Sequence, residues 1–473
     1  MVTADLDVAV VGGGPGGLFA ALALLQSGKV GNIKVFERSK AYRACGAGIT
    51  VDVNGMKAVK AVDSGLCGRL EAVGVDFDSF EEFDQFGQKH ADRASVPIAQ
   101  LDSARQLKKY GVKPGMIGWS DIQQNIYESL PDGTVEFGQA LSGFSQDESG
   151  VQLSFEGQPD VRANYLVAAD GYLSPTRETL LNDGPPPFAE VMLWRARFLW
   201  KDGLGLPQGP EWAQAYIGGS RTAVVYGLPG NVVCWACTVP LSICEERGVH
   251  YDAEQYATSK TRRQVSSFQN MQSEGSSSFH ERCIKAVEDF APQFLECVKN
   301  TDPSTIVEHG LFARTPEQHT SYADVGWGVG RVTLIGDAAH AMRPTGQGLN
   351  TALEDGAVLG WHVQEHGLNP EALRSFEKER IPRVSLIAEQ EQARGRMAYQ
   401  KDAKAASSRI TRLPMSPEAF EDFKNGWQPR PLARRASPAR AYAHRASNCS
   451  PSPRRSLPPL SNPVTATSPI LRI

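Results

Sequence analysis

Three glycines near the start of the chain have the spacing that a dinucleotide pyrophosphate site requires. Gly12, Gly14 and Gly17 form the pattern G-x-G-x-x-G directly after an apolar run at residues 8–11. The first glycine permits a tight turn, the second lets the backbone approach a pyrophosphate, and the third lets a helix pack closely on the strand. Residues 18–27 are predicted to form that helix, whose N-terminal N–H groups and dipole favour an anion.

An acidic residue completes this predicted nucleotide site. Residues 33–37, Ile-Lys-Val-Phe-Glu, read as a second strand that ends in Glu37, 20 residues after Gly17. Folds of this type place a carboxylate there, and it accepts hydrogen bonds from ribose hydroxyls. Such a carboxylate repels a 2′-phosphate, which disfavours NADP at this position, although the neighbouring Arg38 leaves NADP open. A glycine turn without a ligand is the less favoured reading, because strand, glycines, helix and acid occur in the required order.

Two later segments also join an apolar strand to a turn of small residues. Residues 165–169 lead into Asp170 and Gly171, and residues 331–335 lead into Gly336, Asp337 and, three residues later, His340. The first and last glycine-rich segments lie some three hundred residues apart. They are predicted to hold the two ends of one long dinucleotide, FAD. For His340 a structural hydrogen bond is favoured over proton transfer.

In this order the segments resemble the GxGxxG, DG and GD motifs of the single-component FAD-dependent monooxygenases, the class of para-hydroxybenzoate and salicylate hydroxylases. The resemblance covers roughly residues 5–395. It implies that the helix start after residue 344 lies against the isoalloxazine, where backbone N–H groups can stabilise negative charge on the reduced ring. The cofactor-binding residues that it implies are Gly12, Gly14, Gly17, Glu37, Gly48, Asp170, Gly171, Asp337, Gly348, Leu349 and Asn350.

One position departs from the family pattern. Many relatives place an arginine that contacts the FAD pyrophosphate in the segment that corresponds to residues 116–123, and this chain has Trp119 there. An indole ring cannot replace a bidentate phosphate contact. Either another cation serves, with Arg43 and Arg105 as candidates, or FAD binds more weakly.

The resemblance also implies a reaction. NAD(P)H reduces FAD, O₂ adds at C4a to form a hydroperoxyflavin, and an oxygen atom is transferred to an aromatic or similar planar small molecule. Arg195 and Tyr226 are the implied catalytic pair, which in some relatives orients a phenolate. A surface arginine with a core tyrosine is an equally open reading. Aromatic residues between positions 194 and 235 are expected to line the substrate pocket.

The predicted fold is α/β, a Rossmann-like FAD-binding domain with an inserted, mostly antiparallel β-sheet substrate domain, a long C-terminal helix and a disordered tail. We expect residues 1–184 and 323–400 to form the two parts of the FAD-binding domain, and residues 185–322 the substrate-binding sheet. Residues 401–473 are expected to form a basic, largely disordered tail rich in Pro, Ser and Arg. A segment of that composition buries too little apolar surface to offset its chain entropy.

The chain has 473 residues and a formal net charge of −4, but eight arginines and no Asp, Glu or Lys lie in residues 428–473. The remainder is thus acidic, which argues against nucleic-acid binding. There is no apolar run long enough for a membrane span, and the N-terminus lacks the features of a leader, so a cytoplasmic location is expected. The C-x-x-C at Cys234 and Cys237 reads as structural thiols within a strand, and no metal site is expected.

Other function classes stay open. A flavin-dependent epoxidase of a terpenoid- or carotenoid-type alkene uses the same chemistry, and a non-catalytic flavin-binding protein would fit the departure at Trp119. A halogenase is disfavoured because the segment W-x-W-x-I-P is missing. The sequence does not name the substrate, decide between NADH and NADPH, or give the oligomeric state.

Overall fold

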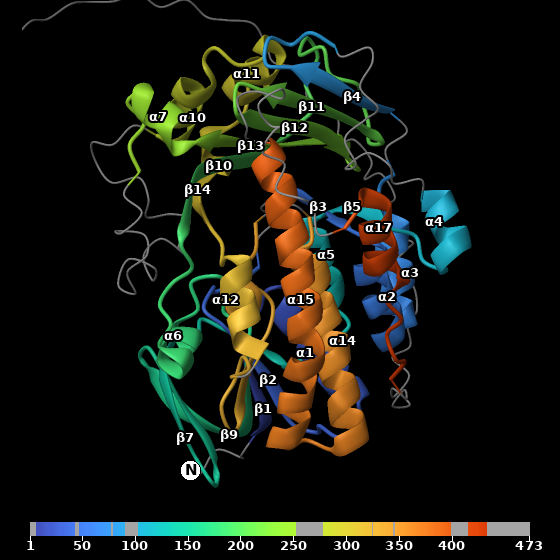
Figure 1. The fold of residues 1–473 in the computed structure, drawn as a ribbon, viewed down its shortest axis with the longest axis vertical. Coiled ribbons are helices and arrows are strands. Elements are labelled where there is room, and N and C mark those ends of the chain that lie inside the picture. Colours follow the sequence, from blue (N-terminus) through green and yellow to red (C-terminus); the bar gives the residue numbers. More distant parts are fainter. Residues whose placement is uncertain are drawn as a thin grey trace, which may run out of the picture. The chain divides into compact units, whose positions relative to one another are not determined.

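The computed structural model describes residues 6–42, 47–76, 79–89, 103–251, 278–323, 325–343, 346–398 and 415–432. These residues form a seven-stranded sheet, a six-stranded sheet and a two-stranded sheet, with helices packed against them. In Figure 1 the labelled strands β1, β2, β7 and β9 of the first sheet lie in the lower part, near the label of the N-terminus, and the strands of the second sheet lie in the upper part. The mixed α/β fold agrees with the expectation from the sequence.

The seven-stranded sheet has a parallel core. β1 (Leu6–Val11) pairs in parallel with β2 (Ile33–Glu37) and β9 (Gln158–Ala168), while β6 (Val135–Phe137) pairs with β2 and β15 (Val332–Leu334) pairs with β9. The antiparallel strands β7 (Leu141–Asp147) and β8 (Gly150–Phe155) extend it. Val8 and Val10 are fully buried, as expected for apolar strands covered on both faces. The predicted strands at residues 8–11, 33–37 and 331–335 are confirmed.

Two helices bring the glycine-rich segments together. α1 (Pro15–Gln26) packs closely against α14 (Gly348–His366). A Cβ atom on Gly360 of α14 would lie 2.9 Å from the Ala23 carbonyl oxygen of α1, and one on Gly356 would lie 3.2 Å from the Ala20 nitrogen. These two glycines therefore allow the helix backbones to approach each other. The helix predicted at residues 18–27 and the helix start predicted after residue 344 are confirmed.

The six-stranded sheet has the order β14-β10-β13-β12-β11-β4. Its strands are β10 (Phe188–Leu199), β11 (Trp212–Gly218), β12 (Arg221–Leu228), β13 (Val232–Pro240), β14 (Val307–Phe312) and β4 (Ser79–Asp84). All neighbours are antiparallel except β4 and β11, which are parallel. The strand β4 comes from a part of the chain that precedes residue 185, so this sheet draws on more of the sequence than the strand pattern alone indicated.

The two faces of this sheet have different neighbours. The helices α7 (Leu241–Glu246), α10 (Phe279–Val287) and α11 (Pro292–Lys299) cover one face and share a hydrophobic core with it. On the other face, the two-stranded sheet of β3 (Gly48–Val51) and β5 (Gly115–Gly118) lies against β12. The second face therefore lies next to β3, which carries Gly48, one of the predicted cofactor residues.

Further helices connect or cover these sheets. They are α2 (Val53–Val62), α3 (Ser64–Val73), α4 (Ser103–Tyr110), α5 (Trp119–Tyr127), α6 (Pro175–Leu181), α12 (Pro316–Thr320), α13 (Asp337–His340), α15 (Pro370–Ala398) and α17 (Pro417–Gly426). The short 3₁₀ turns are η2 (Pro303–Thr305) and η3 (Ser321–Ala323). None of the helices in the described ranges is long and apolar enough to cross a membrane.

Residues 415–432 are folded, which corrects the expectation of a largely disordered segment from residue 401 onward. Ser416 caps α17, Phe420 is fully buried, and the Leu432 N–H donates to the Ala61 carbonyl. The sequence pattern missed this segment because its apolar residues are few and lie far apart. Tertiary contacts with α2 and α15 stabilise it instead. Residues 401–414 and 433–473 lie outside the described part of the chain.

Candidate functional site

The three predicted motifs meet at one edge of the seven-stranded sheet. The GxGxxG turn follows β1, Asp170 follows β9, and Asp337 follows β15. Val11 is the register partner of Ala168, and Ala168 is also the partner of Leu334. Because these strands are parallel, their carboxyl ends lie side by side, which is where open α/β sheets bind ligands.

The glycine turn leaves room for a ligand at one position and fills it at two others. Gly12 has φ +104°, and a Cβ atom there would lie 2.2 Å from the Ala169 carbonyl oxygen. A Cβ atom on Gly17 would lie 2.0 Å from the Gly12 carbonyl oxygen. Gly14, in contrast, has nothing within 4 Å of such an atom. Gly12 and Gly17 are therefore required by the protein itself, whereas Gly14 faces open space at the N-terminus of α1.

Glu37 is oriented by the same turn. Its carboxylate accepts from the Gly13 N–H at 2.8 Å and from the Ser39 N–H at 2.8 Å. The Gly13 carbonyl in turn accepts from the Tyr42 hydroxyl at 2.9 Å and from the Gln123 side-chain amide at 2.8 Å. A carboxylate has about four acceptor positions, so Glu37 can also accept ribose hydroxyls. Tyr42 and Gln123 hold the turn, and the sequence pattern did not single them out for this role.

Asp170 carries an unsatisfied buried oxygen at this edge. Its Oδ2 accepts from the Thr176 N–H at 3.1 Å, and its Oδ1 is buried without a hydrogen-bond partner among the described residues. Burial raises the pKa of this carboxyl, and hydrogen bonds to Ser174 and Thr176 oppose that shift. The following Gly171 has φ +85° with open space beside it. An unsatisfied acceptor next to the glycine turn is well placed for a hydroxyl or amide of a bound ligand.

Arg177 connects the DG segment to the GD segment. Its guanidinium donates to the carbonyls of Ala338 and Ala339 at 2.9 and 2.6 Å, and to Asp183 at 2.8 Å. The side chain is almost completely buried. Arg177 therefore fixes α6 against α13, a role that its place in the sequence did not reveal.

Asp337 lies at the start of α13, where its side chain is exposed. Burial of the site nevertheless raises its pKa, and His340 opposes the shift. This position suits a residue that accepts hydrogen bonds from a bound polyhydroxyl chain.

His340 takes part in a buried network behind this site. Its Nε2 lies 2.6 Å from Asp355 Oδ2, which also accepts from the Gly336 N–H at 2.9 Å, and Arg380 donates to Asp355 Oδ1 at 2.8 Å. Burial would raise the pKa of Asp355, but His340 and Arg380 outweigh it and lower the pKa to about 2. These contacts support the structural role expected for His340 and show how α14 and α15 hold the GD turn.

The N-terminus of α14 is held by the backbone of β3 and by Asp52, the N-cap of α2. Asn350 donates to the carbonyls of Thr50 and Gly346 at 3.0 and 2.7 Å and accepts from the Asp52 N–H at 2.9 Å. Gln347, at the N-cap, donates to Asp52 at 3.3 Å. The side chain of Asn350 is thus occupied with positioning, and the backbone of Gly348 and Leu349 forms the open end of the helix.

Tyr226 contacts the backbone of Gly48, one of the cofactor-binding residues that the resemblance implies. Its hydroxyl accepts from the Gly48 N–H at 2.7 Å and donates to the Gly48 carbonyl at 3.0 Å. Burial raises the pKa of Tyr226 well above its usual range, with Cys234 adding to the shift and Arg195 opposing it. Tyr226 therefore remains a neutral phenol at physiological pH and ties the six-stranded sheet to β3.

Arg195 lies on the same face of the sheet as Tyr226. Burial lowers the pKa of His309 to about 4, and the positive charge of Arg195 adds to that shift. Burial raises the pKa of Tyr172, directly after the DG segment, and Arg195 opposes that shift. The Arg195 charge thus shifts the pKa values of groups on β14, on β12 and directly after the DG segment. Arg195 therefore lies near enough to both the six-stranded sheet and the DG segment to act on them electrostatically.

The aromatic residues predicted to line a substrate pocket mostly lie on the opposite face. Alternation along the strands directs Trp194, Trp212, Tyr216 and Trp235 into the core beneath α7, α10 and α11. The face shared with Tyr226 carries smaller residues such as Ala213 and Val224. The expectation of an aromatic-lined pocket is therefore wrong for these residues, because composition alone did not assign them to a face.

Trp119 stands where many relatives place the arginine that contacts the pyrophosphate, and it carries no charge. It begins α5, and its backbone N–H donates to the Ala47 carbonyl at 3.1 Å. Arg105 is an exposed residue of α4. Arg43 lies outside the described part of the chain.

Two further features of the described structure are the cysteine pair of β13 and a small cavity. Cys234 and Cys237 point to opposite faces, in separate hydrophobic clusters, so the expectation of structural thiols is confirmed. In the described ranges no group of three or more His, Cys, Asp or Glu side chains could hold a metal ion.

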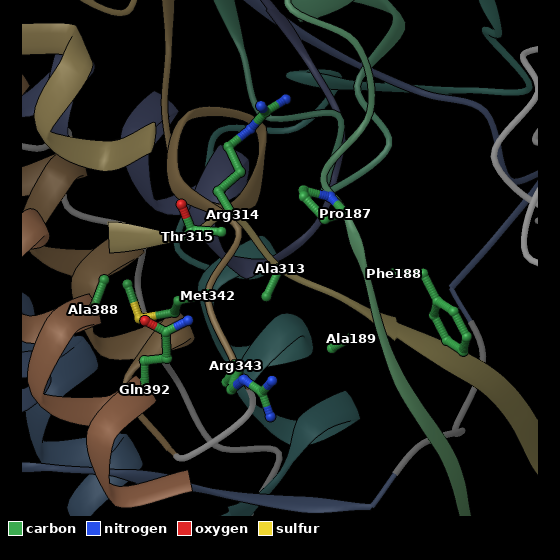
Figure 2. Close-up of a pocket in the computed structure, with 10 residues that line it drawn as sticks. All are labelled: Pro187, Phe188, Ala189, Ala313, Arg314, Thr315, Met342, Arg343, Ala388 and Gln392. Carbon is green, nitrogen blue, oxygen red and sulfur yellow. The ribbon is translucent and has the colours of Figure 1, made fainter. Parts of the chain in front are cut away.

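A cavity of about 140 Å³ is enclosed by four parts of the chain (Figure 2). They are the start of β10, the segment after β14, the segment after α13, and α15. Arg314, Met342, Arg343 and Gln392 line it, and neither Arg195 nor Tyr226 does.

The parallel strand ends, the glycine turn and the oriented carboxylates define a protein that binds a dinucleotide cofactor. Comparison with known proteins identifies that cofactor. The family described as FAD binding domain matches residues 5–391, and the chain belongs to this family. The predicted resemblance is confirmed: the protein is an FAD-dependent monooxygenase, an oxidoreductase.

Several relatives cover most of the chain. A 3-amino-4-hydroxybenzoate 2-monooxygenase of Streptomyces platensis is 26% identical over 88% of this chain and 94% of its own length. A 3-hydroxybenzoate 6-hydroxylase of Polaromonas naphthalenivorans is 27% identical over 90% of this chain and 96% of its own length. A solved structure of Klebsiella pneumoniae HpxO with FAD and uric acid shares the fold, with a TM-score of 0.67 and 22% identity over 89% of this chain and 95% of that one.

Proposed function

We propose that this protein uses NAD(P)H and O₂ to hydroxylate an aromatic or similar planar small molecule at a site between the cofactor and the six-stranded sheet. The relatives support the substrate class, because the two Streptomyces and Polaromonas enzymes described above are named for hydroxylated benzoates. The location of the cofactor is inferred from one observation: Gly14, Asp170 and Asp337 lie together at the carboxyl ends of the parallel strands. Gly14 has open space beside it, and Asp170 has an oxygen without a hydrogen-bond partner among the described residues.

The residues at this edge fit FAD. The N-terminus of α1 and the open side of Gly14 would accommodate the pyrophosphate, and Glu37 would accept the adenosine ribose hydroxyls. Asp170 and Asp337 would accept hydroxyl groups along the ribityl chain, and Gly171 leaves room beside them. The backbone N–H groups of Gly348, Leu349 and Asn350 would face the end of the ring that becomes negative on reduction.

The bound flavin supplies the redox chemistry, taking electrons from NAD(P)H and activating O₂, and the chain positions the reactants. Arg195 would attract the phenolate form of a hydroxylated aromatic, which is more reactive toward an electrophilic oxygen than the phenol. Tyr226 would hold Gly48, and so the wall beside the ring, in place through its two backbone hydrogen bonds. The sheet and β3 would also keep water from the reaction.

The domain division is part of this proposal. Residues 1–184 and 323–400 would form the FAD-binding domain, and the inserted, mostly antiparallel sheet within residues 185–322 would form the substrate domain. The strand β4 joins that sheet from the first part, so the substrate domain would also depend on residues 79–84.

The direct test is to purify the protein, record its visible spectrum and measure NAD(P)H oxidation and O₂ uptake with a panel of hydroxybenzoates, hydroxypyridines and alkenes. We expect a flavin spectrum and substrate-stimulated NAD(P)H oxidation with formation of a hydroxylated aromatic. A folded protein that stays colourless and binds no added FAD would contradict the proposal. Oxidation stimulated only by alkenes would instead support an epoxidase.

A further inference from the structure

Residues 415–432, here called the C-terminal strap, cross from α15 to α2 and are held by buried contacts. Lys57 of α2 donates to the carbonyls of Asn425 and Trp427 at 2.7 and 3.1 Å. Arg383 of α15 donates to the carbonyls of Phe423 and Lys424 at 3.2 and 3.0 Å. Backbone carbonyls satisfied by cations from two helices indicate a fixed docking position rather than a loose terminal segment.

One side chain of the strap reaches the segment that supports the predicted flavin ring. Lys424 Nζ lies 2.5 Å from Asp52 Oδ2 and 3.0 Å from Glu421 Oε1. The exposed fractions of the Lys424 and Asp52 side chains are only 6% and 15%. Burial alone would lower the pKa of Lys424 and raise that of Asp52, but their mutual attraction reverses both shifts. The two groups therefore remain a charged pair inside the protein.

Asp52 passes this contact on to the start of α14. Its Oδ1 accepts from the Val53 N–H at 2.7 Å and caps α2. Its Oδ2, the oxygen that Lys424 contacts, accepts from the Gln347 side chain at 3.3 Å. Its backbone N–H donates to Asn350 Oδ1 at 2.9 Å. The Asp52 side chain and backbone thus hold two residues of the first turn of α14.

We propose that Lys424 is a positioning residue for the flavin: through Asp52 it fixes the N-terminus of α14 and balances the negative charge next to it. This inference rests on the proposed placement of the isoalloxazine against Gly348–Asn350. Without Lys424, the Asp52 carboxylate would be left uncompensated beside a ring that gains negative charge on reduction. Both the affinity for FAD and the ease of its reduction should therefore depend on a residue more than seventy positions after α14 begins.

The test compares full-length Lys424→Met with Lys109→Met, which removes one positive charge from the exposed pair between α4 and Asp422 of the same strap helix. We expect Lys424→Met to weaken FAD binding to the apoprotein by about tenfold, the scale of one lost charge-assisted contact. We also expect it to shift the midpoint potential of bound FAD to more negative values. Lys109→Met should leave both quantities unchanged, and Lys424→Arg should restore them.

A double variant keeps the inference testable if Lys424→Met folds poorly. In an Asp52→Asn background the carboxylate is absent, so adding Lys424→Met should change the potential little. Equal FAD affinity and potential in Lys424→Met and the unaltered protein would overturn the inference. So would equal effects of Lys424→Met and Lys109→Met. The proposed cofactor site is tested independently of Lys424 by Gly14→Ala, and unchanged FAD binding in that variant would contradict it.

Discussion

At the scale of single residues, two glycines of the first turn have different reasons to be glycine: the fold requires one, and a bound ligand would require the other. Gly12 combines a positive φ with a backbone contact that excludes any side chain, whereas Gly14 has φ −69° and nothing close to it. An alanine at Gly14 therefore suits the protein but occupies the space in which a pyrophosphate would approach. The two positions look alike in the sequence and differ only in their surroundings.

This difference predicts the behaviour of Gly14→Ala. We expect the free energy of unfolding of the apoprotein to fall by only about 1 kcal/mol, since alanine is a poorer N-cap than glycine but meets no atom here. FAD affinity should fall by at least about tenfold, because the new methyl group displaces the phosphate. Urea unfolding and titration of apoprotein with FAD measure the two quantities. Gly143→Ala, at another open position on β7, is the control and should change neither.

Arg195 gives a second prediction at this scale. Arg195→Met removes the positive charge from the face of the sheet that Tyr226 and His309 share. We expect NAD(P)H oxidation to continue while the fraction coupled to product formation falls, with hydrogen peroxide released instead. Product yield per NAD(P)H measures this. Arg162→Met, at a partly exposed pair with Asp147, is the control. Unchanged coupling and substrate affinity in Arg195→Met would remove the assignment.

At the scale of elements, buried arginines connect helices through ion pairs and through hydrogen bonds to backbone carbonyls. Arg177 joins α6 to α13, and Arg380 joins α15 to α14 through Glu354 and Asp355. The Arg380 pairs are almost fully desolvated, and Arg177 is buried while its partner Asp183 is partly exposed. Loss of a buried partner leaves polar groups without compensation. These contacts, rather than helix propensity, hold the three motifs in register.

We therefore expect Arg177→Met to lower the free energy of unfolding by at least about 2 kcal/mol. The carbonyls of Ala338 and Ala339 would lose their donor. Asp183 would keep only its contacts with Arg314 and Tyr322 among the described residues. A lysine at this position could not restore the forked geometry. Urea unfolding of the apoprotein measures the change. The partly exposed pair of Arg162 and Asp147 provides the comparison, and Arg162→Met should cost less than about 1 kcal/mol. Equal effects of the two substitutions would argue against the buried tie.

At the scale of the whole molecule, the strap sets where the chain can be shortened. A chain that ends after Leu432 keeps the contacts of Arg430 with Glu379 and of Leu432 with Ala61. It should retain FAD content and the melting temperature. A chain that ends after Met415 loses α17 and exposes the residues it covers, so it should melt several degrees lower. Thermal unfolding followed by circular dichroism checks both, and identical melting temperatures would show that the strap contributes nothing.

Buried histidine predicts how stability depends on pH. Burial, aided by the charges of His340 and nearby arginines, lowers the pKa of His319 to about 3, below its ordinary value of 6.5. Between these two pH values His319 is protonated in the unfolded chain but not in the folded protein. The free energy of unfolding therefore falls as the pH is lowered through this range. His319→Leu should flatten the decline in unfolding free energy between pH 7 and 4.5 by about 2 kcal/mol. His250→Leu, at an exposed position, should not.

The sequence by itself determined the strands, turns and helices that carry the cofactor motifs, because each depends on local chemistry. The glycines of the first turn, the acid at Glu37 and the aspartates at 170 and 337 follow short apolar runs, which favour buried strands when turn residues bound them. These short-range signals also carried the family resemblance, and the assignment to an FAD-dependent monooxygenase followed from them.

Only the tertiary structure decided which faces and which distant residues meet. Trp194 and Trp235 looked like pocket residues until strand alternation and the covering helices placed them in the core. Lys424 and Arg177 act through partners far away in the chain, and no periodicity records such a contact. The strap folds because cations on α2 and α15 satisfy its backbone, which its own composition could not predict.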